Sequence, residues 1–241
     1  MFKEKVLITT NDVDFNKEVK LSSLFLMMQK VATDNVDHLK MGRDELMKNN
    51  RVWVVIRTEV QLYRPIKVGE EITIITHPGE VKSFIYTRYF QIYDKKNNLI
   101  ANSSSTWLVI DFTTRRIVPH PFEDRKMPEY HHSDDLPLPE KITQDASRFI
   151  YERVALYSET DVNEHINNTK YVDYVLDCHN LDFYRKYYVC RIVINFDKEI
   201  HPGENIKLYS NDSNPEVVIG KVNDKESFKA LVEYQERNSN L

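Results

Sequence analysis

Residues 157–177 read YSETDVNEHINNTKYVDYVLD, and they place three polar side chains directly ahead of an amphipathic helix. Asp161, Asn163 and His165 occupy alternate positions, and in an extended segment residues two apart point to the same side. The three side chains are therefore expected to converge. A hydrolase needs such groups, because a base or a residue that holds water must lie beside dipoles that stabilise developing negative charge.

The helix that follows can supply those dipoles. Its first amides, at Asn168 and Thr169, point toward the same space and carry the positive end of the helix dipole. A second interpretation is structural, with Asn167 or Asn168 capping the helix after a polar turn. On residue types alone the two interpretations carry similar weight.

The composition indicates a large apolar core and no strong charge. The 241 residues are 41% hydrophobic with 14 Tyr and 11 Phe, which favours β-sheet, and the net charge is −4. This balance argues against nucleic-acid binding. Cys178 and Cys190 are too few for a disulfide framework, no signal peptide or membrane-spanning run is seen, and we expect a cytoplasmic protein. With only five glycines and no glycine-rich phosphate loop, no cofactor is expected.

One pattern occurs twice along the chain. The turn DVD at 12–14 aligns with DVN at 161–163, and each precedes an amphipathic helix. Further on, VGE at 68–70 aligns with PGE at 202–204. The interval between the two matches is longer in the first copy, and a second helical piece at 41–50, MGRDELMKNN, is expected to account for the excess.

The two copies are predicted to form two domains of the same plan. Five of the nine prolines lie between residues 119 and 139, where they indicate a surface linker. We therefore expect domains at 1–118 and 148–241, joined by a linker at 119–147. Each would be an α+β unit with a helix wrapped by an antiparallel sheet. Strands are expected at 6–10, 84–93, 104–111, 153–157, 217–222 and 228–235.

This plan resembles the hotdog fold, and two hotdogs in tandem resemble the acyl-acyl carrier protein thioesterases. TDVNEHINNTKYVDYVLD, at 160–177, looks like that family's D-x-N-x-H-x-N-N-x-K-Y signature. NNRVWVVIRTEVQLYRPIKVGEEI, at 49–72, is similar to its first-domain strand pair. INFDKEIHPGENI, at 194–206, is similar to the region where the plant enzymes carry a catalytic Glu followed by a Cys. The resemblance covers nearly the whole chain and implies an α+β double hotdog.

The resemblance also implies a site, a substrate and a partner. The implied catalytic residues are Asp161, Asn163, His165 and Glu199. Ile200 stands where the plant enzymes have cysteine, which excludes a cysteine nucleophile there and favours a mechanism built on Glu199 and water. The implied substrate is a fatty acyl thioester carried by acyl carrier protein.

The duplication supplies an independent argument for catalysis in the second copy. In the alignment above, Asp12 matches Asp161, and the positions of Asn163, His165 and Glu199 hold Asp14, Asn16 and Pro65. A purely structural set could have been kept in both copies. We therefore interpret the second domain as catalytic and the first as a surface that binds the acyl chain.

A mechanism follows as a hypothesis. Glu199, alone or with His165, is expected to position or deprotonate water, while amides at the start of the helix, aided by Asn163, polarise the thioester carbonyl. Direct attack by a carboxylate is the alternative. The residues expected to line an acyl tunnel are Leu24, Phe25, Met28 and Trp53.

Other functions and partners are weighed beside this one. The same chemistry on acyl-CoA, or acyl binding without catalysis, are the alternatives. Arg115-Arg116 and Arg185-Lys186 are candidate docking sites for the carrier protein. His131-His132 with Asp134-Asp135 could suggest a metal, but such runs in linkers are usually solvated, and no metal is expected. A chain with two fused hotdogs could act as a monomer or a homodimer.

Overall fold

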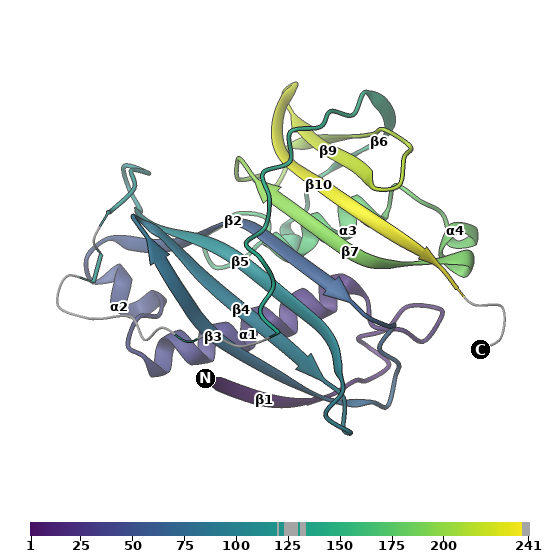
Figure 1. Cartoon of the computed structure of the whole chain (residues 1–241). Coiled ribbons are helices and arrows are strands. Elements are labelled where there is room, and N and C mark those ends of the chain that lie inside the picture. Colours follow the sequence, from purple (N-terminus) through teal and green to yellow (C-terminus); the bar gives the residue numbers. More distant parts are fainter. Residues whose placement is uncertain (120, 123–129, 131–133, 238–241) are drawn as a thin grey trace.

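One antiparallel sheet runs through the whole molecule (Figure 1). The computed structural model describes residues 1–119, 121–122, 130 and 134–237. The strand order is β1-β3-β4-β5-β2-β7-β10-β9-β8-β6, so each half of the chain contributes five neighbouring strands. The two halves of the chain thus form two half-sheets that are joined edge to edge.

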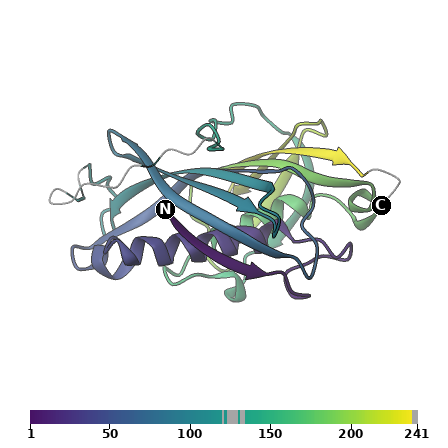
Figure 2. The ribbon, with the colours of Figure 1, turned by 60° about the horizontal axis from the view of Figure 1, so that its bottom comes forward.

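The first half contains a long helix and the five strands on one side of the sheet. Its elements are β1 (Phe2–Leu7), α1 (Leu21–His38), α2 (Arg43–Met47), β2 (Arg51–Leu62), β3 (Glu71–Lys82), β4 (Ile85–Tyr93) and β5 (Leu99–Asp111). Figure 2 shows α1 lying along one face of the sheet. Leu24 and Val31 of α1 are fully buried against strand residues such as Ile74. Each such side chain contributes about 1.5–3 kcal/mol of burial free energy.

The second half repeats the plan with a shorter helix. Its elements are β6 (Arg148–Val154), the 3₁₀ turn η1 (Tyr157–Glu159), α3 (Asn168–Leu176), α4 (Leu181–Lys186), β7 (Tyr187–Phe196), β8 (Asn205–Ser210), β9 (Glu216–Val222) and β10 (Lys225–Glu236). Helix α3 has 9 residues where α1 has 18. This difference accounts for most of the extra residues between the DVD turn and the VGE turn of the first half. Each half also has a second short helix, since α4 follows α3 as α2 follows α1. The prediction that the helical piece at 41–50 explains the interval is therefore wrong.

The halves are fused through β2 and β7. These strands pair antiparallel from Arg57 opposite Asn195 to Gln61 opposite Arg191. Arg191 Nε also donates to Glu59 Oε1 across the junction at 2.7 Å. Because the junction is made of backbone hydrogen bonds, the two helices are held on the same face of one sheet, where α1 packs on α3.

Residues 134–147, between the two halves, cross the face of the sheet opposite the helices (Figure 1). Among the described residues, Ser104 Oγ donates to Pro137 O at 2.6 Å and Ile142 N donates to Asn195 Oδ1 at 2.9 Å. Ile142 also packs into an apolar cluster on that face. Of the residues considered for a metal, His131 and His132 lie outside the described part. Asp135 Oδ1 lies 3.1 Å from His77 Nε2, so this carboxylate ties the linker to the sheet.

Two predicted strands end earlier than expected. The strands expected at 6–10 and 153–157 are β1, which ends at Leu7, and β6, which ends at Val154. In each case the following residues turn away because a carboxylate accepts a backbone amide. Asp12 Oδ2 accepts from Thr9 N, and Glu159 Oε2 accepts from Leu156 N, both at 2.8 Å.

Candidate active site

The polar motif of the second half forms a tight turn. Thr160 and Ile166 pair as an isolated antiparallel bridge, and Asp161 N donates to His165 O at 2.8 Å. Glu164 closes the turn in the left-handed region, with φ of 63°. The expectation of an extended segment is therefore wrong, since the backbone reverses direction within the motif, but the three side chains still line one cavity.

Asp161 shapes this turn. Its Oδ1 accepts the amide of Asn163 at 2.8 Å, and its carbonyl accepts the amide of Glu164 at 3.1 Å. A carboxylate that binds the amide two residues ahead is a common way to stabilise a turn. The contacts of Asp161 thus fix the positions from which Asn163 and His165 project.

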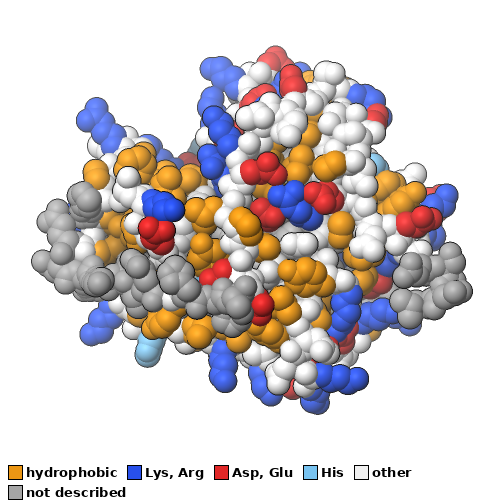
Figure 3. Space-filling model, in the orientation of Figure 1, with side chains coloured by type: hydrophobic (Ala, Val, Ile, Leu, Met, Phe, Trp, Pro, Cys, Tyr) orange, Lys and Arg blue, Asp and Glu red, His pale blue; other side chains and the backbone are white. Residues whose placement is uncertain are grey.

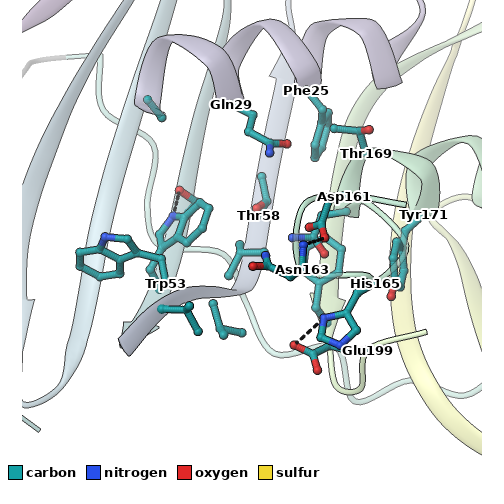
Figure 4. Close-up of a pocket in the computed structure, with 18 of the residues that line it drawn as sticks. Phe25, Gln29, Trp53, Thr58, Asp161, Asn163, His165, Thr169, Tyr171 and Glu199 are labelled. Atoms are coloured by element: carbon teal, nitrogen blue, oxygen red, sulfur yellow. Dashed lines mark hydrogen bonds and ion pairs between the residues drawn. The ribbon is translucent and has the colours of Figure 1, made fainter. Parts of the chain in front are cut away.

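His165 and Glu199 are brought together from distant parts of the sequence. His165 Nδ1 lies 3.5 Å from Glu199 Oε1, and the ring of His201 packs edge-on against that of His165 at 4.7 Å (Figure 4). The side chain of His165 is 17% exposed and that of Glu199 is 35% exposed. Both groups are therefore reachable by water and partly shielded by protein. Glu199 lies in the loop after β7, which ends at Phe196.

The loop that carries Glu199 is anchored on both sides of Ile200. The Ile200 amide donates to the hydroxyl of Tyr171 at 3.1 Å, and its carbonyl accepts from the Ile166 amide at 2.8 Å. Burial raises the pKa of Tyr171, so this hydroxyl stays protonated. The Ile200 side chain is fully buried. The loop is therefore fixed next to the turn that carries His165.

Two arginines of the first half reach this site. Arg115, in the loop after β5, forms an ion pair with Glu199 through its Nη2. Arg43, the first residue of α2, directs its Nε to Asn163 Oδ1 at 3.4 Å. The site therefore contains residues of both halves. Sequence reasoning had placed Arg115 in a docking pair and had missed Arg43, because neither contact is local.

The start of α3 differs from the prediction. Asn167 caps the helix, with Oδ1 accepting from Thr169 N at 2.9 Å and O accepting from Lys170 N at 2.8 Å. Thr169 N is thus already bonded and is not free to bind an oxyanion. The Asn168 amide donates no hydrogen bond within the described residues, and Asn168 is one of the residues that line the cavity. Of the two predicted amides, only that of Asn168 is left without an acceptor there.

A cavity of about 550 Å³ adjoins these groups and extends between α1 and the sheet of the first half (Figure 4). Asp161, Asn163, His165 and Glu199 all line it. Of the residues predicted to bind the acyl chain, Phe25, Met28 and Trp53 line the cavity as well. Leu24 does not line the cavity. It precedes Phe25 by one residue, so its side chain points to another side of α1, where it is fully buried in the core.

The first half contains a turn of the same construction. Asp14 N donates to Glu18 O at 2.8 Å, and Asn16 N donates to Asp14 Oδ1 at 2.8 Å. Lys17 closes the turn with φ of 60°, and Val19 N donates to Ile66 O as Ile166 N donates to Ile200 O. The equivalent pairs are Asp14 and Asp161, Asn16 and Asn163, Glu18 and His165, and Pro65 and Glu199.

The alignment made from sequence, which matched Asp12 with Asp161, is therefore wrong by two residues. Asp12 instead occupies the place of Glu159, since each carboxylate accepts the amide three residues earlier. The match of Pro65 with Glu199 holds, because the Val19 and Ile166 bonds fix that register. Aspartate and asparagine thus occur in both turns, and of the four predicted catalytic residues only His165 and Glu199 are particular to the second half.

Within the described residues no cluster of His, Cys, Asp or Glu is arranged to hold a metal ion. None of the helices there is both long and apolar enough to cross a membrane.

Comparison with known proteins places these features in a family. Residues 1–126 match the model of the acyl-ACP thioesterase N-terminal domain, and residues 143–239 match that of the C-terminal domain. An acyl-[acyl-carrier-protein] hydrolase from chloroplasts of Cuphea viscosissima is 21% identical over 214 residues, which cover 83% of this chain and 52% of that protein. The chain thus spans about half the length of the plant relatives it matches.

Solved structures share the fold at low identity. An acyl-ACP thioesterase from Bacteroides thetaiotaomicron superposes with a TM-score of 0.83 at 20% identity, covering 97% of both chains. A 12:0-ACP thioesterase from Umbellularia californica gives 0.85 at 19% identity, covering 98% of this chain and 97% of that one. The predicted double hotdog fold is confirmed.

Proposed function

The chain belongs to the acyl-ACP thioesterase family, and we propose on this basis that it hydrolyses fatty acyl thioesters of acyl carrier protein. The observation that carries the proposal is the approach of His165 Nδ1 to Glu199 Oε1, at 3.5 Å, on the wall of a cavity large enough for an acyl chain. Of the four predicted catalytic residues, these are the two whose equivalents in the first half, Glu18 and Pro65, are different residues.

In the proposed reaction a water molecule held by Glu199 and His165 attacks the thioester carbonyl carbon. Its proton passes to Glu199 or to His165 as the carbon–oxygen bond forms. The Asn168 amide, with the side-chain amide of Asn163, donates to the oxyanion of the tetrahedral intermediate. The carbon–sulfur bond then breaks, and the proton returns to the thiolate, leaving a free fatty acid and the carrier thiol. A thiol with a pKa of ~8.5 leaves readily as its thiolate, so the reaction needs little protonation of the sulfur.

Several features favour water over a protein nucleophile. The buried Ile200 side chain offers no nucleophilic atom. The same oxygen of Glu199, Oε1, pairs with Arg115 and faces His165. A carboxylate held in this way is suited to position a water molecule. Direct attack by Glu199 would form an anhydride, whose accumulation in a rapid-quench experiment would distinguish the two routes.

The test is a pair of substitutions at the two distinctive positions. Glu199→Gln and His165→Ala are each expected to lower kcat on acyl-ACP by about 10²–10⁴-fold, the usual contribution of general acid–base catalysis. Binding of the acyl chain should persist, because the apolar cavity wall is unchanged. Glu164→Gln is the matched control, since Glu164 lies in the same turn but is exposed.

Near-normal rates in either Glu199→Gln or His165→Ala would overturn the assignment of these residues. If acyl-CoA is hydrolysed as fast as acyl-ACP of the same chain length, or faster, the carrier in the proposed substrate would instead be coenzyme A. Binding of acyl groups without any turnover would identify an acyl-binding protein.

A further inference from the structure

A buried arginine lies in the cavity without an acidic partner. Arg88, on β4, is 5% exposed, and its Nη1 donates to Asn35 Oδ1 at 2.9 Å and to Thr76 Oγ1 at 3.1 Å. No carboxylate in the described part of the chain forms an ion pair with it. A buried charge is costly unless it is paired, so an unpaired guanidinium on a cavity wall invites an anionic or oxygen-bearing ligand.

The remaining donors of Arg88 open on the cavity. A guanidinium has five N–H donors, and the two bonds above use only those on Nη1. Nε and Nη2 have no partner among the described residues and are not sealed in the protein interior, while the side chain lines the cavity. Burial lowers the pKa of Arg88 to about 10, so it remains charged at neutral pH.

Arg88 lies far from the catalytic groups. Figure 4 draws Phe25 of α1 on the side of the cavity where Asp161 and Glu199 lie. Asn35, the partner of Arg88, follows Phe25 by ten residues, which at 1.5 Å per residue places it about 15 Å further along the helix. The cavity therefore runs from the catalytic turn to Arg88.

The cavity wall has other polar groups that a plain hydrocarbon chain does not require. Besides Arg88, the first half contributes Gln29, Thr33, Thr58, Thr87 and Ser105 to the lining. A methyl end pressed against Arg88 would remove water from the guanidinium and return no hydrogen bond, which is unfavourable. A carboxylate end would accept two parallel N–H bonds from the free side of the guanidinium.

We propose that the end of the cavity at Arg88 is a polar subsite, and that the preferred substrates are acyl thioesters whose far end carries a carboxylate. This rests on the proposed thioesterase function and extends it by naming the substrate class. Arg88 acts by binding the substrate and takes no part in bond breaking. A far-end hydroxyl fits the same donors more weakly, because it offers a neutral acceptor.

The experiment compares acyl-ACP substrates in matched pairs. Each pair has the same number of carbons and ends either in a methyl group or in a carboxylate, over a series of increasing lengths. At the length that reaches Arg88, the wild-type protein should favour the carboxylate end by at least tenfold in kcat/KM. Arg88→Leu should lose that preference, and Arg88→Lys should keep part of it, since the charge remains but the planar fork is lost. Short acyl chains that do not reach Arg88 are the control and should be hydrolysed equally by all three proteins.

Two outcomes overturn the subsite, and neither depends on the variants folding. One is a wild-type preference for the methyl end at every length, and the other is equal rates within every pair. If no thioester is hydrolysed, the proposed function fails, and the subsite is tested separately by binding free dicarboxylic acids and fatty acids of equal length. The chain's two tryptophans, Trp53 and Trp107, both line the cavity, so their fluorescence reports that binding.

Discussion

Glu199 is held by contacts that come from three different elements. Tyr171 of α3 fixes the adjoining backbone through the Ile200 amide, Arg115 binds the carboxylate, and His165 faces it from the turn. Such support matters because a catalytic group displaced by about 1 Å can lose about 10²-fold in rate. Among these contacts, the one made by Tyr171 is the most buried, since its side chain is 2% exposed.

Tyr171→Phe tests this support at the residue scale. The substitution leaves the Ile200 amide buried without an acceptor, which should lower the free energy of unfolding by about 1–3 kcal/mol. It should also lower kcat on acyl-ACP, because the loop with Glu199 loses one of its two backbone anchors. Denaturant unfolding and steady-state kinetics measure the two effects.

Tyr209→Phe is the control for that change, since Tyr209 packs in the outer cluster on the face opposite the helices. A Tyr171→Phe protein with unchanged stability and unchanged kcat would show that the hydroxyl does not fix the loop.

At the scale of elements, the two helices differ in what they do. Helix α1 is the longer and supplies one wall of the cavity, whereas α3 carries the cap at Asn167 that ends the catalytic turn. The turn that follows α3 is tied to the sheet by a buried network on β9. Glu216 accepts from Tyr234 OH at 3.0 Å and lies 2.7 Å from His179 Nε2, and Ser210 Oγ also donates to it.

This network predicts a pH dependence of stability. Burial alone would raise the pKa of Glu216, but hydrogen bonds from His179, Ser210 and Tyr234 outweigh burial and hold the pKa below its usual 4.5. A carboxyl whose pKa is lowered in the folded state stabilises the protein above the unfolded-state pKa, and that contribution is lost as pH falls through the folded-state pKa.

Glu216→Gln should remove that contribution. The difference in unfolding free energy between wild type and Glu216→Gln is expected to be steady above pH 4.5 and to shrink as the pH falls below it. Unfolding curves at several pH values measure the difference. A difference that grows on acidification would contradict the assigned direction of the pKa shift.

At the scale of the whole molecule, the two halves have the same turn but different chemistry. Beside the first turn lies a smaller cavity of about 250 Å³, lined by Asp14, Glu18 and Pro65 among others. There Glu18 is paired with Arg237 at 2.7 Å, and Pro65 has no ionisable group. The first half therefore has no equivalent of the pair formed by His165 and Glu199. It contributes instead to the site of the second half, through α1 and through Arg115.

Arg115→Ala tests whether that contribution extends beyond binding. We expect kcat on acyl-ACP to fall by about tenfold with little change in KM, because Arg115 acts on Glu199 and not on the acyl chain. Arg115→Lys should restore much of the lost rate, since the positive charge beside the Glu199 carboxylate remains.

Arg116→Ala is the matched control, because Arg116 is the next residue in the same exposed loop. An Arg115→Ala protein with a raised KM and an unchanged kcat would assign Arg115 to carrier binding and not to positioning Glu199.

The sequence by itself determined the duplication, the family resemblance and a set of four candidate residues that includes His165 and Glu199. Gly69 and Gly203, with φ of 86° and 90°, mark equivalent turns, and they could be matched from sequence because a left-handed turn strongly favours glycine. His165 and Glu199 could be named because the motifs around them are short and contiguous. The register of the first turn could not be read correctly, since two aspartates lie two residues apart and only hydrogen bonds show which one forms the turn.

Only the tertiary structure decided which groups meet. Arg115 and Glu199 are 84 residues apart, and Arg88 and Asn35 are 53 apart, so no local pattern links them. The pairing of β2 with β7 brings the first half against the catalytic turn. That pairing is made by backbone hydrogen bonds, which form with many different side chains, so the sequence does not reveal it. The packing of the helices on the two half-sheets decides three further features. These are the extent of the cavity, the free donors of Arg88 and the capped amide of Thr169. Burial and hydrogen bonding depend on neighbouring residues in the folded chain, so a single position in the sequence cannot reveal them.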